Sequence, residues 1–229
     1  MPWRYSIGFA KARGNITKLT YEPSFNQIKD ITDGKGNKTT LVYDGKGNLI
    51  SRTHPDGSEE QLSYDGFGNL SSLSDGKTNT TSFAYDGNGN LTTMTYPDSS
   101  VETYTYDANG NQLTWSWDGN ADGDADFIDI YTYDANGNKL TRSGDNNVDG
   151  NADRIETYTY DTNGNQLTFS WDLNGDGNAN IITTYTYDAN GNRLLFSYDN
   201  NGDGNVIRID TYTYDANGNQ LSYSRDNNA

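Results

Sequence analysis

The clearest pattern along the chain is a strict alternation of polar and aromatic residues. The run Thr-Tyr-Thr-Tyr occupies residues 103–106 and returns at 157–160, 184–187 and 211–214. A period of two places the tyrosines on one face of a strand and the threonines on the other. Thr and Tyr are also good strand formers. The pattern therefore predicts β-strands with one aromatic face and one hydroxyl face.

Each alternating run ends in a Tyr-Asp pair and a turn that contains glycine. After Tyr106-Asp107, for example, the chain continues Ala108-Asn109-Gly110-Asn111. An Asn-Gly pair supplies the positive φ angles of a tight hairpin turn, so each run should form a β-hairpin. A leucine follows the tyrosine by six residues in some repeats and by seven in others. Because a slip of one residue changes the face of a side chain, we expect a bulge or an altered turn there.

The hairpins recur with two fixed spacings. The Tyr-Asp tyrosines are 21 residues apart at Tyr43, Tyr64, Tyr85 and Tyr106, and 27 apart from there to Tyr133, Tyr160, Tyr187 and Tyr214. Fixed periods of this size indicate a repeat architecture. We therefore expect one continuous array with short repeats over residues 1–105 and long repeats over 106–229.

The predicted fold class is all-β. Tandem hairpins should form a long, twisted or spiralling antiparallel sheet that is solenoid-like, in which each repeat contacts its neighbours. Only 32% of the chain is hydrophobic and its mean hydropathy is -0.92, so a thick core is not expected. The 18 tyrosines allow a thin sheet to bury area, because each ring is apolar with a polar tip.

The Tyr-Asp-x-x-Gly-Asn motif resembles the YD-repeat family, also called RHS repeats, of bacterial RHS proteins, toxin-complex proteins and teneurins. The segment from Arg13-Gly14-Asn15 to Tyr21-Glu22-Pro23 is similar to it as well. The resemblance implies hairpins joined edge to edge in a spiralling sheet, which in that family can wind into a shell around a toxic domain. The Asp-Pro-x-Gly boundary motif of the family does not occur in this sequence.

The six additional residues of each long repeat form an acidic segment between hairpins. Asp145, Asn147, Asp149, Asp153 and Glu156 fit the twelve-residue calcium-loop pattern D-x-[DN]-x-[DN]-G-x5-E. Calcium binds six to eight hard oxygens, and alternate residues of a curled loop can supply them. The same positions are occupied in the other long repeats by Asp118, Asn120, Asp122, Asp126 and Asp129, by Asp172, Asn174, Asp176, Asn180 and Thr183, and by Asp199, Asn201, Asp203, Ile207 and Asp210.

These loops predict calcium (Ca2+) as the cofactor. The likeness is to calcium loops placed between strands, with the acid at position nine closing the site. The alternative is a solvated Asn/Asp/Gly-rich turn that keeps the sheet edge soluble.

The charge and the motifs exclude several classes of function. A net charge of -16 opposes binding to nucleic acid and to anionic membranes. No apolar run approaches the roughly 20 residues of a membrane-spanning helix, so no membrane insertion is expected. The single histidine, His54, lies in a turn beside Pro55, and the common hydrolase, nucleotide and zinc motifs are missing. We therefore expect a protein that is not an enzyme.

Two hypotheses for function follow. The first is a structural segment of an extracellular or cell-surface array or filament, stabilised by calcium and self-associating through unpaired sheet edges. The second is an RHS-like shell or adhesin fragment that encapsulates a toxin or binds carbohydrate. An aromatic column could stack on sugars or pack across strands; its members are Trp115, Trp117, Phe169, Trp171, Phe196, Tyr198 and Tyr223.

Overall fold

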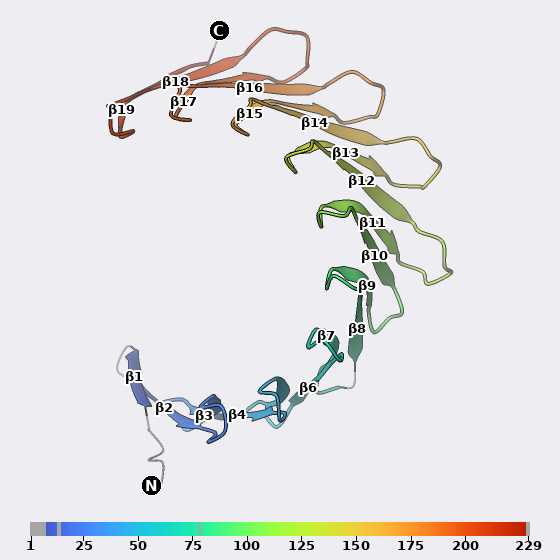
Figure 1. Ribbon diagram of the computed structural model, residues 1–229, viewed down its shortest axis with the longest axis vertical. Helices are drawn as coiled ribbons and strands as arrows, with labels where there is room; N and C mark the ends of the chain where they lie inside the picture. Colours follow the sequence, from blue (N-terminus) through green and yellow to red (C-terminus); the bar gives the residue numbers. More distant parts are fainter. Residues whose placement is uncertain (1–7, 13–14, 78, 228–229) are drawn as a thin grey trace. The chain divides into compact units, whose positions relative to one another are not determined.

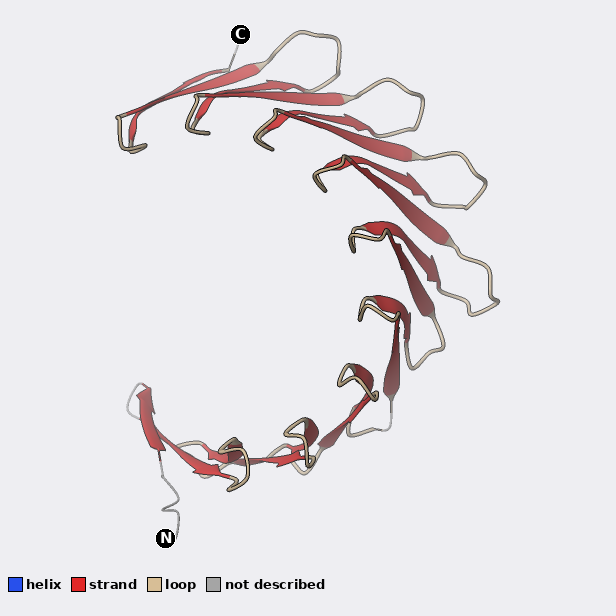
Figure 2. Ribbon diagram, viewed as in Figure 1, coloured by secondary structure: helices blue, strands red, loops and turns tan. Residues whose placement is uncertain are grey.

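The computed structural model describes residues 8–12, 15–77 and 79–227, and all regular elements among them are β-strands (Figures 1 and 2). The predicted all-β class with tandem hairpins is confirmed. The described residues include no helix long and apolar enough to cross a membrane. The chain divides into two compact units, Met1–Val101 and Glu102–Ala229.

The first unit contains short strands joined by short turns. Its strands are β1 (Gly8–Ala12), β2 (Asn15–Tyr21), β3 (Ile28–Thr32), β4 (Lys38–Tyr43), β5 (Leu49–Thr53), β6 (Glu59–Tyr64), β7 (Leu70–Ser74), β8 (Thr80–Tyr85) and β9 (Leu91–Thr95). Consecutive strands pair antiparallel throughout this unit.

The second unit contains longer strands. They are β10 (Val101–Tyr106), which begins at the boundary, β11 (Gln112–Asp118), β12 (Phe127–Tyr133), β13 (Lys139–Asp145), β14 (Arg154–Tyr160), β15 (Gln166–Asp172), β16 (Ile181–Tyr187), β17 (Arg193–Asp199), β18 (Arg208–Tyr214) and β19 (Gln220–Asp226). From β11 to β19 each strand pairs antiparallel with the next.

The aspartate of the Tyr-Asp pair closes its own turn. In the turn after β14, the Asp161 Oδ1 accepts the backbone N–H groups of Asn163 and Asn165 at 2.9 Å, and Oδ2 accepts the Asn165 side-chain amide at 2.9 Å. The Gly164 N–H donates to the Asp161 carbonyl at 3.1 Å. An aspartate in the first position is favoured in such turns because its carboxylate satisfies the N–H groups that follow.

The turn differs in detail from the expected one. Only the glycine has a positive φ, +84° at Gly164, and Asn163 does not. The hydrogen bonds describe a type I turn followed by a left-handed glycine, which is a three-residue hairpin loop. The prediction of positive φ angles from the Asn-Gly pair was therefore correct for glycine alone, because the aspartate cap stabilises the type I turn.

The tyrosine of the pair links successive hairpins. The Tyr160 hydroxyl donates to the backbone carbonyl of Lys139 at 2.9 Å, and Lys139 is the first residue of β13 in the preceding hairpin. The same bond joins Tyr43 to Ile28, Tyr64 to Leu49, Tyr133 to Gln112 and Tyr214 to Arg193. The Tyr-Asp pair thus has two roles. The tyrosine bonds to the preceding repeat, and the aspartate accepts the N–H groups that hold its own turn, an arrangement that we call the turn lock.

A β-bulge beside each of these tyrosines explains the two leucine spacings. In a long repeat Thr159 pairs with Thr168 and Tyr160 with Gln166, so Leu167 is the additional residue. In a short repeat the register shifts at the same place, and Tyr64 pairs directly with Leu70. Both kinds of repeat therefore share one bulge, and their leucines occupy different positions within it.

The sheet has no apolar core among the described residues, since no hydrophobic side chain there is buried. On the tyrosine face, aromatic rings pack in cross-strand pairs, such as Tyr158 on Phe169 with centroids 5.2 Å apart. On the opposite face, hydroxyls pair across strands, as Thr159 and Thr168 do at 2.6 Å. Cross-strand pairs thus provide the packing that a core provides elsewhere, and they account for much of the aromatic column.

Candidate functional site

The acidic segments form four loops in the second unit, between the strands of β11–β12, β13–β14, β15–β16 and β17–β18. They span residues 118–126, 145–153, 172–180 and 199–207 and project from one end of the strands, with the Tyr-Asp turns at the other end (Figure 1). In short repeats a five-residue turn such as 33–37 takes the place of the loop. The loop is thus the structural difference between the two repeat lengths.

The first aspartate organises each loop. Asp172 Oδ1 accepts the Gly175 N–H at 2.8 Å and Oδ2 accepts the Gly177 N–H at 2.8 Å, and the residue is 6% exposed. Asp118, Asp145 and Asp199 also accept N–H groups from their own loops. Burial of a carboxylate is costly unless hydrogen bonds satisfy it, so the curl of the loop and the burial of its first acid depend on each other.

The later positions continue this arrangement. Asp176 Oδ1, at position five, accepts the Asn178 N–H at 2.8 Å, and Oδ2 accepts the Asn174 side-chain amide at 3.1 Å. The Asn178 backbone N–H is the main cause that lowers the pKa of Asp176, followed by the Asn174 amide. The loop thus favours an ionised carboxylate at position five.

Position nine closes the base of three loops. Asp153 Oδ2 accepts the Asn146 N–H at 2.7 Å, and the Asn180 side-chain oxygen accepts the Leu173 N–H at 2.6 Å. Asp126 accepts the Gly119 N–H in the same way at 2.8 Å. Ile207 in the fourth loop has no side-chain oxygen. Its backbone N–H donates to the Tyr198 carbonyl at 2.9 Å.

The structure separates position twelve from the loops. In the first loop, Asp129 at position twelve pairs with Trp115 on the tyrosine face, whereas Asp118 at position one directly follows Trp117 of that same face. Alternate residues of a strand point to opposite faces, so the first and twelfth positions face apart. Among the described residues, no group of three or more His, Cys, Asp or Glu side chains is close enough to hold a metal ion. Of the predicted ligand positions, one, three, five and nine lie in the loops, and position twelve lies in the strand that follows.

The position-twelve acids instead form ion pairs on the tyrosine face. Asp129 is 0% exposed and accepts the Arg142 Nη2 at 2.7 Å and the Arg154 Nη2 at 3.4 Å. Arg142 also reaches Glu156 at 3.2 Å, and that contact extends the pairing to a second acid. The hydrogen bond to Asp129 raises the pKa of Arg142 above its ordinary value.

A similar cluster joins Asp210 to Arg208 and, at 2.9 Å, to Arg225. The two arginines hold the pKa of Asp210 far below its usual range. These clusters were not predicted from the sequence. The available signal was the recurrence of arginine at alternate positions of strands whose partners carry an acid.

The fourth position of every loop adopts the left-handed conformation. It is occupied by Gly175 and Gly202 in two loops and by Ala121 and Val148, with φ of +61° and +53°, in the others. A Cβ on Gly175 would lie 1.8 Å from the Ala152 carbonyl oxygen, so the third loop lies directly on the second. Glycine is required there by close approach as well as by φ.

Replacing Val148 by Gly should therefore stabilise the protein. The left-handed conformation costs a side chain with a Cβ about 1–2 kcal/mol, and the entropy of glycine offsets about 0.5–1 of it, which leaves a gain of roughly 0.5–1 kcal/mol. Thermal melting would measure it, with Ala121→Gly as a weaker companion because alanine is not β-branched. A lower melting temperature for Val148→Gly would contradict the strain.

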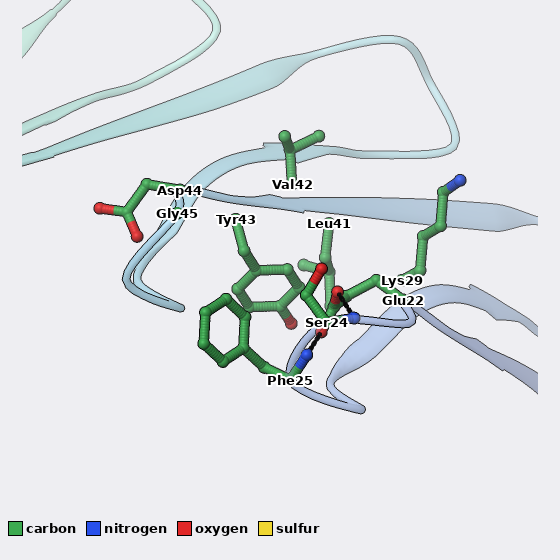
Figure 3. Close-up of a pocket in the computed structure, with 9 residues that line it drawn as sticks. All are labelled: Glu22, Ser24, Phe25, Lys29, Leu41, Val42, Tyr43, Asp44 and Gly45. Atoms are coloured by element: carbon green, nitrogen blue, oxygen red, sulfur yellow. Dashed lines mark hydrogen bonds between the residues drawn. The ribbon is translucent and has the colours of Figure 1, made fainter. Parts of the chain in front are cut away.

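A second candidate is an open groove of about 430 Å³ in the first unit (Figure 3). Phe25, Val42 and Tyr43 line it beside Glu22 and Lys29. The Glu22 carboxylate accepts the Ser24 and Phe25 N–H groups at 2.7 and 2.6 Å, which holds the turn between β2 and β3. These hydrogen bonds account for the conformation of the turn.

His54 lies elsewhere in the same unit. Its Nε2 is 3.1 Å from the Glu60 carboxylate, which also pairs with Arg52 at 2.9 Å. The histidine therefore joins a partly exposed ion-pair cluster on β5 and β6, next to a turn.

The comparisons with known proteins agree with this architecture. The RHS repeat family matches residues 21–59, 64–101 and 85–152, which is more than half of the chain. No curated protein sequence gives a significant match.

Similar folds occur among solved structures. The crystal structure of TcdB2-TccC3 without its hypervariable C-terminal region is 18% identical with a TM-score of 0.65, over 92% of this chain and 12% of that one. TcdB2-TccC3-Cdc42 is 17% identical with a TM-score of 0.62, over 88% and 11%. The Tc holotoxin pore of Photorhabdus luminescens is 18% identical with a TM-score of 0.54, over 91% and 13%.

The chain thus spans about an eighth of the length of the proteins it resembles, and at these identities the likeness concerns the fold. The family match rests on the sequence itself, and the Tyr-Asp turns and hairpin order described above are its structural counterpart. The chain belongs to the RHS repeat family.

Proposed function

We propose that the chain is a non-catalytic structural segment of an extracellular or cell-surface array, and that the loops of its long repeats bind calcium. The observation that supports this most is the recurrence of four loops in register, each curled around its first aspartate. Loops of this kind hold several hard oxygens close together, which is the chemistry that calcium requires.

Calcium would act on an unfavourable distribution of charge. The loops carry eleven aspartates and no lysine or arginine, in a chain of net charge -16. Each bound ion would add two positive charges and reduce repulsion between consecutive loops. The acids at position twelve of three loops pair with arginines. The proposed ligands are therefore the oxygens of positions one, three, five and nine, completed by backbone carbonyls and water.

Thermal melting with calcium and with a chelator tests the proposal. For dissociation constants of about 10⁻⁴ to 10⁻³ M, about 1 mM calcium should stabilise each filled site by roughly 0.4–1.4 kcal/mol. The melting temperature should therefore rise with calcium and fall when the chelator is added. The fourth loop, with Ile207 at position nine, should respond least.

The variant Asp149→Asn/Asp176→Asn removes two exposed position-five acids without disturbing the buried first acids. It should lose part of the calcium response. The control Asp56→Asn/Asp98→Asn removes two exposed turn acids of the short repeats and should keep all of it. Equal melting curves with calcium and chelator would exclude the calcium sites and leave the loops as solvated turns.

A second candidate function is a segment of an RHS-type shell or adhesin that encloses a toxin or binds carbohydrate. The similarity to TcdB2-TccC3 over 92% of the chain favours it. Negative-stain micrographs distinguish the two candidates. Fibres would support an array joined through sheet edges, whereas closed hollow particles of a longer chain would support the shell.

A further inference from the structure

Charge in the second unit is separated between two surfaces. All lysines and arginines of residues 102–229 lie on the tyrosine face, and they are Lys139, Arg142, Arg154, Arg193, Arg208 and Arg225. The acids of that face are Glu102, Asp129, Glu156 and Asp210, so its cations outnumber its acids. The loops at the strand ends contain aspartates and no cation.

The cations lie over aromatic rings rather than extending into solvent. The Arg193 guanidinium is 4.7 Å from the centroid of the Tyr212 ring, and the Lys139 ammonium is 4.6 Å from that of Tyr158 and 3.9 Å from the Glu156 carboxylate. Guanidinium groups held in this way lose little side-chain entropy when they bind a carboxylate. The face is a preorganised surface for carboxylates, flanked by rings such as Trp117, which is 42% exposed.

We propose that the tyrosine face of the second unit binds the acidic loops of a second copy of this chain. The loops project beyond the strand ends (Figure 1), where another molecule can reach them. Their aspartates complement the excess of cations on the face. The contact joins two different surfaces, so a pair of copies leaves one tyrosine face and one set of loops unused, and assembly can continue.

Ionic strength decides whether this contact outweighs the repulsion between two chains of net charge -16. At about 0.15 M salt the Debye length is about 8 Å, so distant charges are screened while contacting carboxylates and guanidinium groups still attract. At roughly 1 M the length falls to about 3 Å and the contact itself weakens. Association should therefore occur near physiological salt and be lost in concentrated salt.

Sedimentation velocity over a range of protein concentrations tests the proposal. The series is run in chelator, so its outcome is separate from calcium binding. The variant Lys139→Gln/Arg193→Gln removes two cations that do not hold buried Asp129 or Asp210. It should raise the dissociation constant at least tenfold, about 1.4 kcal/mol, with an unchanged circular dichroism spectrum.

The matched control is Lys35→Gln/Lys46→Gln, which makes the same change in net charge on exposed turns of the first unit. It should associate like the wild type. A mixture of Lys139→Glu/Arg193→Glu with Asp122→Lys/Asp124→Lys should associate more strongly than either variant alone, because a reversed face then meets a reversed loop.

Two results would overturn the proposal. One is a wild-type chain that sediments as a monomer at every ionic strength. The other is association that the Lys139→Gln/Arg193→Gln chain retains in full, because strand pairing at the sheet edges would then explain it.

Discussion

Arg142→Leu is expected to lower the free energy of unfolding by about 3 kcal/mol, the largest effect of a single substitution that the structure indicates. The Asp129 carboxylate is 0% exposed and would lose its Arg142 donors at 3.0 and 2.7 Å. Removal of one partner of a buried ion pair costs about 3–5 kcal/mol. Arg154 remains at 3.4 Å, which places the expected loss at the lower end.

Urea denaturation would measure the loss, and amide exchange should accelerate first in β12 and β13, where the pair lies. The control Arg193→Leu removes an arginine that lies over the Tyr212 ring and makes no ion pair with buried Asp129 or Asp210, so it should cost less than about 1 kcal/mol. The double variant Asp129→Leu/Arg142→Leu should recover most of the stability, because apolar replacement of a buried pair is often neutral. If Arg142→Leu and Arg193→Leu cost the same, the buried pair does not stabilise the sheet.

Acid should unfold the array over a narrow range below about pH 4. The turn asparagine amides, followed by backbone N–H groups, lower the pKa values of the turn aspartates from the ordinary 3.8. A group whose pKa is lowered on folding adds stability above its unfolded pKa, and that stability is lost as the pH falls through the folded value. The effect accumulates because the same lock recurs at Asp107, Asp134, Asp161, Asp188 and Asp215.

The variant Asp161→Ala tests the lock in one turn. It should be less stable than the wild type at pH 7, and the difference should narrow as the pH falls through the lowered pKa of the wild-type carboxylate, which is then protonated as well. Asn163→Ala is the control, because only the backbone N–H of Asn163 contributes to the lock. A difference between Asp161→Ala and the wild type that stays constant with pH would show that the carboxylate charge has no role.

The local elements of the fold could be predicted because their causes lie close together in the chain. Asp161, Gly164 and Asn165 make the turn with contacts over at most four residues. The alternation of Thr159 and Tyr160 assigns the two faces of β14 by period alone. The family follows from the same short-range motif, which is why its recurrence predicted the hairpin array.

The bulge was harder to place. The leucine follows the tyrosine by six residues at Leu70 and by seven at Leu167, which suggested two geometries. Both kinds of repeat nevertheless have the same single register shift. Pairing between strands sets that register, and the single sequence carries no direct signal of which residue is left without a partner. The link from Tyr160 to the Lys139 carbonyl was hidden for the same reason.

By itself the sequence determined the repeat lengths, the all-β class, the turns and the position of the acidic loops, because each depends on residues within one hairpin. Only the tertiary structure decided what the acids do. Asp118 and Asp129 match the first and twelfth positions of one loop pattern, but strand pairing places the first in the loop curl and the second between Arg142 and Arg154 on the opposite face. The alternation of side chains separates them, since the twelfth residue lies within the next strand and points away from the loop.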